Sequence, residues 1–128
     1  MVALLFGAMT APVKAAWNDH ADSCDAAFTI DDYDGVIKNC GLEYEDTAQD
    51  FETSTDLLDR CLDKNLMGQT ATQLGWAYKH KNSNIRAARF AKIARKEFQW
   101  VLANGCASPQ RELAQEYLTT SIRSMTAH

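Results

Sequence analysis

Residues 69–103 read QTATQLGWAYKHKNSNIRAARFAKIARKEFQWVLA, and this stretch decides the fold class. On both sides of its polar segment 81–84, apolar residues recur at spacings of three and four, which is the period of an amphipathic helix. The stretch therefore predicts two helices, at about 69–80 and 85–103, joined by a tight turn into a hairpin. Gly105 then ends the second helix, because glycine tolerates the left-handed backbone that closes many helices.

The same period extends over most of the remaining chain. The best candidate for a β-strand, residues 28–30, is too short to be convincing. We therefore predict an all-α fold built from antiparallel helical hairpins. The other predicted helices span about residues 18–28, 32–41, 46–63 and 109–122. Gly41 ends the second of these helices, and Ser108 caps the last.

The composition indicates one domain with an uneven charge distribution. The chain has 128 residues, of which 46% are hydrophobic, and this is enough for a single core. Its formal net charge is -4. Residues 1–63 carry 14 Asp and Glu against 3 Lys and Arg, whereas residues 64–128 carry 3 against 10. A partner that is uniformly acidic or uniformly basic is therefore not indicated.

The N-terminal residues are typical of a bacterial secretory signal peptide. Residues 2–11 form a largely apolar run that is too short to span a bilayer, and Val13-Lys14-Ala15 resembles a small-residue cleavage site. The basic segment that usually precedes such a run is absent, and a buried N-terminal helix is the alternative. We predict a signal peptide over 1–15 and a single exported domain, periplasmic or secreted, over 16–128 that does not span a membrane.

Four cysteines in an exported chain predict two disulfides. Three pairings are possible, and we favour Cys24–Cys40 with Cys61–Cys106. Each bridge would stabilise the fold by about 3 kcal/mol in the chain-entropy model. A zinc site is not expected, because the chain has no C-x-x-C motif and no histidine at ligand spacing from a cysteine.

The central hairpin resembles the tetratricopeptide repeat (TPR). The matching residues are Leu74, Gly75, Tyr78, Ala87 and Ala94. The small ones among them occupy positions where two helices of a TPR hairpin approach closely. The sequence departs from the family pattern at three positions, where Ala71, Ala91 and Gln99 replace the Trp, Phe and Pro of the family.

A second, weaker match begins at residues 31–40, with Gly35 at the small-residue position of a second helix. The resemblance lies within about residues 17–103. It implies about two stacked hairpins plus a C-terminal packing helix, and a surface that binds other proteins. An unrelated helical bundle is the alternative, since repeats usually need about three copies for stability.

No catalytic motif is present, and the sequence predicts a protein without enzymatic activity or cofactor. None of His20, His80 and His128 has a nucleophile or carboxylate at a useful helical spacing. The aspartates at 31–34 lack the other ligands of a calcium loop and are better explained as helix caps. A small hydrolase that uses helical carboxylates is the alternative from another class of function.

The leading hypothesis is a protein–protein interaction module that uses the first helix of the central hairpin. Gln73, Trp76 and His80 would leave the core face of that helix and line a groove. Exposed tryptophans are frequent hot spots, and packing of Trp76 against a neighbouring helix is the alternative. A more specific version of the hypothesis is a periplasmic immunity protein that neutralises a cell-wall-degrading toxin.

The second helix of the hairpin has one basic face, formed by Arg86, Arg89, Lys92 and Lys96. Nucleic acid is not an expected partner, because the protein is predicted to be exported and its net charge is negative. The face is either solvated or in contact with acidic residues of the same chain or a second copy, and an acidic protein or an anionic surface is the remaining alternative. A homodimer through the acidic and basic halves, or an oligomeric envelope component, would make self-association sensitive to salt.

Overall fold

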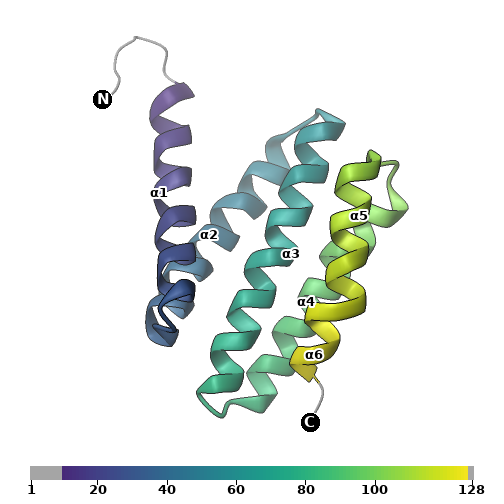
Figure 1. Ribbon diagram of the computed structural model, residues 1–128. Helices are drawn as coiled ribbons and strands as arrows, with labels where there is room; N and C mark the ends of the chain where they lie inside the picture. The colour runs from purple at the N-terminus through teal and green to yellow at the C-terminus, as the bar shows by residue number, and fades with distance from the viewer. Residues whose placement is uncertain (1–9, 127–128) are drawn as a thin grey trace.

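The computed structural model describes residues 10–126, and it describes side chains over residues 20–125. This part of the chain is all-α, as predicted (Figure 1). The helices are α1 (Thr10–Thr29), α2 (Tyr33–Thr53), α3 (Leu57–His80), α4 (Asn84–Ala103), α5 (Ser108–Glu116), the π-helical turn η1 (Tyr117–Ser121) and α6 (Ile122–Thr126). Residues 1–9 of the predicted signal peptide lie outside the described residues, so the leader stays a prediction.

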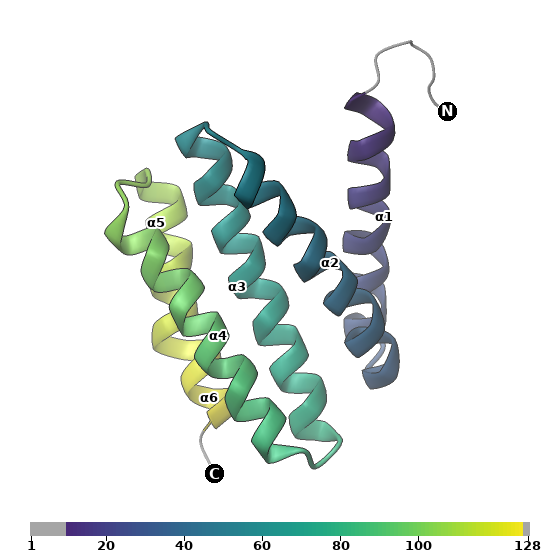
Figure 2. The same ribbon diagram turned by 180° about the vertical axis from the view of Figure 1, so that it is seen from behind.

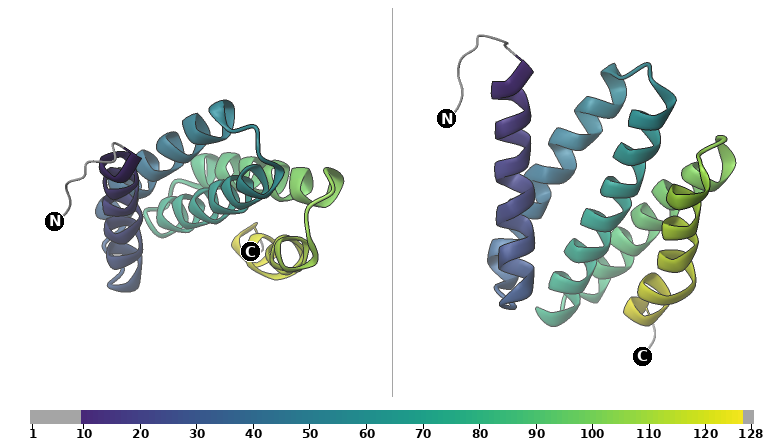
Figure 3. Two further views of the ribbon diagram at one scale, coloured as in Figure 1. Left: turned by 90° about the horizontal axis from the view of Figure 1, so that it is seen from above. Right: turned by 45° about the horizontal axis from the view of Figure 1, so that its top comes forward.

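Consecutive helices from α1 to α5 run antiparallel and form two layers, while η1 and α6 continue α5 in the same direction. α1, α3 and α5 lie toward the viewer in Figure 1, and α2 and α4 lie toward the viewer from behind in Figure 2. The views in Figure 3 show the same alternation. We call these the front layer and the back layer. α1 packs on α2, α2 on α3, and α3 on α4, while α5 contacts both α3 and α4.

The predicted boundary at Gly41 is wrong, because this residue lies inside α2. A glycine costs a helix about 1 kcal/mol relative to alanine. The helix continues regardless, since the next two turns bury Glu43, Thr47 and Phe51. Burial of a single large apolar side chain contributes about 1.5–3 kcal/mol, which exceeds the glycine penalty.

The predicted helix 46–63 is also wrong, because the chain breaks in its middle. Ser54 has an extended backbone after α2, and Asp56 caps α3 by accepting a hydrogen bond from the Asp59 N–H at 3.1 Å. The predicted helix 69–80 is therefore the second half of a longer α3. The helix predicted at 85–103 is confirmed as α4.

Several local signals agree with the structure. Asp32 caps α2 by accepting a hydrogen bond from the Gly35 N–H at 3.0 Å, and Gly105 follows α4 with a φ of 75°. Ser108 was predicted as the cap of the last long helix, but Ala107 holds that position and no side chain caps the helix. Ser108 is instead the first residue of α5, next to a proline that is favourable there.

Both predicted disulfides are confirmed. Cys24–Cys40 joins α1 to α2, and Cys61–Cys106 joins the start of α3 to the loop between α4 and α5. All four cysteines are buried. α1 packs mainly on α2 alone, whereas a central helix packs on two neighbours. The Cys24–Cys40 bridge therefore adds a link that holds α1 to the fold.

Small residues let the helices approach closely, although not all at the positions expected. Ala91 and Ala94 of α4 are fully buried in the main core cluster. Gly75 lies against Met125 of α6 rather than mainly against α4. Gly68, which the sequence pattern did not single out, faces Phe98 so closely that a β-carbon there would lie 2.5 Å from the ring.

Candidate functional site

One face of α3 remains open in the front layer. Its residues follow one another at helical spacings of three and four, and we call them the α3 stripe: Leu58, Leu62, Leu66, Gln69, Gln73, Trp76 and His80. Leu58 is 53% exposed and Leu62 is 47% exposed, while His80 at the opposite end is also exposed. The other members of the stripe are half-buried. The stripe therefore changes from apolar at its N-terminal end to polar and aromatic at its C-terminal end.

Two of the predicted partner-binding residues meet in an aromatic stack. The ring centroids of Trp76 and His80 are 5.7 Å apart, and those of His80 and Tyr33 are 4.8 Å apart with parallel planes. Lys79 Nζ lies 5.0 Å from the centre of the Trp76 ring, within range of a cation–π interaction. Trp76 also packs against the main core cluster. The tryptophan is thus held by its neighbours and is only partly exposed.

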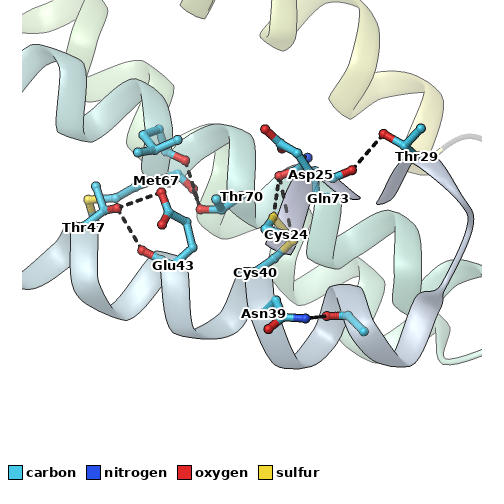
Figure 4. Close-up of a disulfide and its surroundings, with 12 residues drawn as sticks. Cys24, Asp25, Thr29, Asn39, Cys40, Glu43, Thr47, Met67, Thr70 and Gln73 are labelled. Carbon is cyan, nitrogen blue, oxygen red and sulfur yellow. Dashed lines mark hydrogen bonds between the residues drawn. A yellow bond between two sulfur atoms is a disulfide. The ribbon is translucent and has the colours of Figure 1, made fainter. Parts of the chain in front are cut away.

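Gln73, the third residue predicted on this helix to bind a partner, bridges two helices. Its Nε2 donates a hydrogen bond to Oδ1 of Asp25 at 3.2 Å, and its Oε1 lies 3.2 Å from Sγ of Cys24 (Figure 4). A disulfide sulfur has no proton to donate, so the second approach is a polar contact. The side chain is half-buried and ties α3 to α1 beside the disulfide. Its first role in this fold is to position α1.

A buried carboxyl that the sequence did not reveal lies near the same disulfide. Glu43 is fully buried, and its Oε1 has no hydrogen-bond partner among the described side chains (Figure 4). Thr47 Oγ1 lies 3.5 Å from its other oxygen. Burial, followed by the negative charge of Asp46, raises the pKa of Glu43 from 4.5 to about 7. Asp46 itself contacts His20 of α1 at 2.5 Å.

A second polar cluster joins α2, α3 and α4. Glu97 is buried, accepts a hydrogen bond from the Tyr44 hydroxyl at 2.5 Å, and pairs with Lys64 at 2.8 Å. Burial and the neighbouring Glu97 raise the pKa of Tyr44. Each group in the cluster has a partner, so it stabilises the contact between the two layers.

Aromatic residues extend this cluster toward the end of α2. Phe51 and Trp100 meet edge to face with ring centroids 5.3 Å apart. The guanidinium of Arg60 lies 3.9 Å from the centre of the Phe51 ring and donates hydrogen bonds to the backbone oxygens of Phe51 and Ser54. Arg60 thus satisfies carbonyl groups at the C-terminal end of α2.

A cavity of about 410 Å³ lies beside these residues. Its lining combines apolar and aromatic side chains with polar and charged ones: Tyr44, Glu45, Asp46, Ala48, Gln49, Phe51, Glu52, Lys64 and Met67. Glu43, whose raised pKa would suit acid–base chemistry, does not line it. The carboxylates that do line the cavity are Glu45, Asp46 and Glu52.

The basic residues of α4 lie on its solvent side. Arg86, Arg89, Lys92 and Lys96 are all exposed, and Arg86 approaches the ring of Tyr78 at 5.7 Å. Three ion pairs are found within residues 20–125, namely His20–Asp46, Lys64–Glu97 and Lys81–Asp34, and none involves this basic face. Among the described side chains, the alternative of an ion pair between this face and acidic residues of the same chain is therefore not found, and the face is exposed.

No group of three or more potential metal-ligating residues occurs in the described part of the chain. No helix among the described residues is long and apolar enough to cross a membrane. No protein-family model, curated protein or solved structure matches the chain.

Proposed function

We propose that this chain is an exported, non-enzymatic interaction module that binds another protein through the α3 stripe. The observation that carries the proposal is the stack of Tyr33, His80 and Trp76, which remains partly exposed at one end of the stripe. Exposed leucines continue the surface at the other end. Exposed leucines and partly exposed aromatic rings along one helix face are typical of interaction sites.

The stack also favours tight binding on entropic grounds. Immobilising a flexible side chain at an interface costs about 0.5–1.5 kcal/mol. Trp76 is already held between His80 and the core cluster, and Lys79 lies over its ring. A partner that covers it would therefore lose little side-chain entropy.

The proposed compartment is supported by the cysteines. Both bridges are buried, and disulfides persist in oxidising environments such as the bacterial periplasm. The TPR-like interpretation is supported by the alternation of the helices between two layers, as in a stack of helical hairpins. Stacked repeats present extended concave surfaces to their partners.

The test is capture of a partner with and without the tryptophan. The oxidised protein is immobilised and exposed to an extract of the exported proteins of its own cells, and bound proteins are quantified. Trp76→Ala is expected to lower the affinity for a specific partner about 30-fold, which is the effect of a hot spot that contributes about 2 kcal/mol.

Ile85→Ala is the matched control. Ile85 is 80% exposed and lies on α4, outside the α3 stripe, so capture by this variant should equal that of the unmodified chain. Equal capture by the Trp76 and Ile85 variants, with both folded by circular dichroism, would contradict the proposed surface.

The more specific version, an immunity protein, makes its own prediction. If the captured partner degrades cell-wall peptidoglycan, adding this chain in equimolar amount should abolish that activity. If the partner keeps its activity in the complex, the immunity role is contradicted, whereas the proposed interaction module is not.

A further inference from the structure

The N-terminal half of the α3 stripe carries exposed leucines. Leu58 and Leu62 are 53% and 47% exposed, and Leu66 follows one turn later and is half-buried. In Figures 1 and 2 this end of α3 lies farther from α1 than the other end does. α1 packs mainly on α2 and reaches α3 where Asp25 meets Gln73. The leucine side chains therefore remain available to a partner.

Carboxylates lie beside this half of the stripe, and we call them the acidic border: Asp22, Asp25, Asp59 and Glu116. All four are exposed, and none belongs to an ion pair described above. Asp25 accepts a hydrogen bond from Gln73 of the stripe, and Asp22 lies one turn before it on α1. Asp59 lies one turn before Leu62 on α3. The leucines thus have negative charge beside them.

Glu116 adds a carboxylate from the other side of α3, since α1 and α5 flank that helix in Figure 1. The next residue, Tyr117, is half-buried. Its pKa is raised by burial and then by the negative charges of Glu116 and Asp25. The Tyr117 hydroxyl therefore lies within electrostatic range of one carboxylate from α1 and one from α5.

The cations of the neighbouring segments are engaged elsewhere. Arg60 of α3 donates hydrogen bonds to backbone oxygens at the end of α2, and Lys64 pairs with Glu97. Arg111, the cation of α5, lines a small cavity together with Leu102 of α4. The uncompensated charge beside the N-terminal half of the stripe is therefore negative.

A helix is the kind of segment that fits this surface. Residues 10–126 contain no strand, so they offer no sheet edge to which a partner could add a strand. The stripe instead follows one helix, and its part from Leu58 to Gln73 spans about 22 Å at 1.5 Å per residue. A partner helix of about four turns has the same length.

We propose that the partner presents an amphipathic α-helix to the α3 stripe, with apolar side chains on the leucines and with lysine or arginine toward the acidic border. The inference rests on the function proposed for the stripe and adds the chemistry of the partner. Opposite charges around an apolar contact speed association and reject partners of the wrong charge. Lys79 and His80 lie at the far end of the stripe, so the basic residues of the partner belong over its N-terminal half.

The test measures the binding of two model helices to the oxidised protein by fluorescence anisotropy. The lysine peptide is about four turns long, with leucine on one face and lysine on the other. The glutamate peptide has glutamate in place of each lysine. We expect the lysine peptide to bind at least about tenfold more tightly, because the glutamate peptide brings like charges together. Its binding should weaken in about 1 M salt, where the Debye length is about 3 Å.

Asp25→Asn with Glu116→Gln tests the acidic border. Both changes keep the side-chain shape, and asparagine keeps an oxygen that can accept from Gln73. Loss of two surface ion pairs should weaken binding of the lysine peptide about fivefold. Glu45→Gln with Glu52→Gln is the matched control, because it makes the same charge change on exposed residues of α2, in the back layer. The control should bind as the unmodified chain does.

Three results would overturn the proposal. Equal affinity for the two peptides, or no binding of either, would contradict a basic partner. An equal loss of affinity in the border variant and its control would mean that the lysine peptide responds only to net charge. Leu62→Ala should lower the affinity about fivefold by removing apolar contact, and unchanged binding would place the peptide elsewhere.

These failures are distinguishable from failure of the proposed function. If the peptide results contradict a basic helix while Trp76→Ala still loses its partner, the interaction module stands and only the chemistry of the partner is wrong. If Trp76→Ala keeps its partner, the stripe itself is not the binding surface.

Discussion

Replacing Glu43 with glutamine should stabilise the fold at alkaline pH and leave it almost unchanged in acid. Glu43 is fully buried with one oxygen unpartnered, and burial together with Asp46 raises its pKa from 4.5 to about 7. Between these pH values the folded state keeps a proton that the unfolded state releases. The free energy of unfolding therefore falls as pH rises through this window, and the loss is complete above the folded pKa.

The magnitude follows from the two pKa values. Each pKa unit corresponds to about 1.4 kcal/mol, so the rise from 4.5 to about 7 amounts to about 3 kcal/mol at pH 8. Glutamine has nearly the same shape and cannot ionise. We expect Glu43→Gln to unfold with a free energy up to about 3 kcal/mol above that of the unmodified chain at pH 8, and with a similar value at pH 4.

Urea unfolding with intact disulfides, followed by circular dichroism from pH 4 to pH 8, measures this difference. Glu45→Gln is the control, because it removes an exposed carboxylate two residues away and should give a small difference at every pH. A Glu43→Gln difference that does not grow between pH 4 and pH 8 would refute the reasoning. So would a variant that is less stable than the unmodified chain at pH 8.

Three further changes test the packing and the bridges. Gly68→Ala should destabilise the fold by about 1–3 kcal/mol by overpacking Phe98, and its melting temperature should fall. Gly41→Ala should raise the melting temperature by the equivalent of about 0.5–1 kcal/mol, because a β-carbon there meets nothing within 4 Å, and a fall would contradict the described environment. Replacing both cysteines of a bridge with serine should cost about 3 kcal/mol for Cys24–Cys40 and about 1 kcal/mol more for Cys61–Cys106, whose sequence separation is 45 against 16. Equal losses in urea unfolding would speak against the loop-entropy explanation.

Local chemistry made much of the fold predictable. α4 is a long amphipathic helix between a polar turn and Gly105, and each of these signals acts within a few residues. Asp32 caps α2 for the same reason, because its side chain needs only a backbone N–H three residues away. The disulfide pairing also agrees with the favoured alternative among three.

Part of the candidate site was predictable as well. His80 is exposed and Trp76 is half-buried against the core cluster, which is the alternative that the sequence left open, and the two rings stack on each other one turn apart. Tyr33 was not anticipated as the third ring, because it is distant in the sequence and reaches His80 only after α1, α2 and α3 have packed. Gln73 has the same spacing as its neighbours, yet contact with Asp25 and the disulfide gives it a different environment.

The sequence by itself determined the helical class, the ends that are set by caps and glycine, and the division of charge between the two halves. Tertiary structure alone decided that α2 runs through Gly41, that Glu43 becomes buried, and that Gly68 receives the ring of Phe98. The physical reason is one of scale and range. A local conformational preference contributes about 1 kcal/mol and acts within a single helical turn. Burial of side chains against another helix contributes several times that free energy and depends on residues far along the chain.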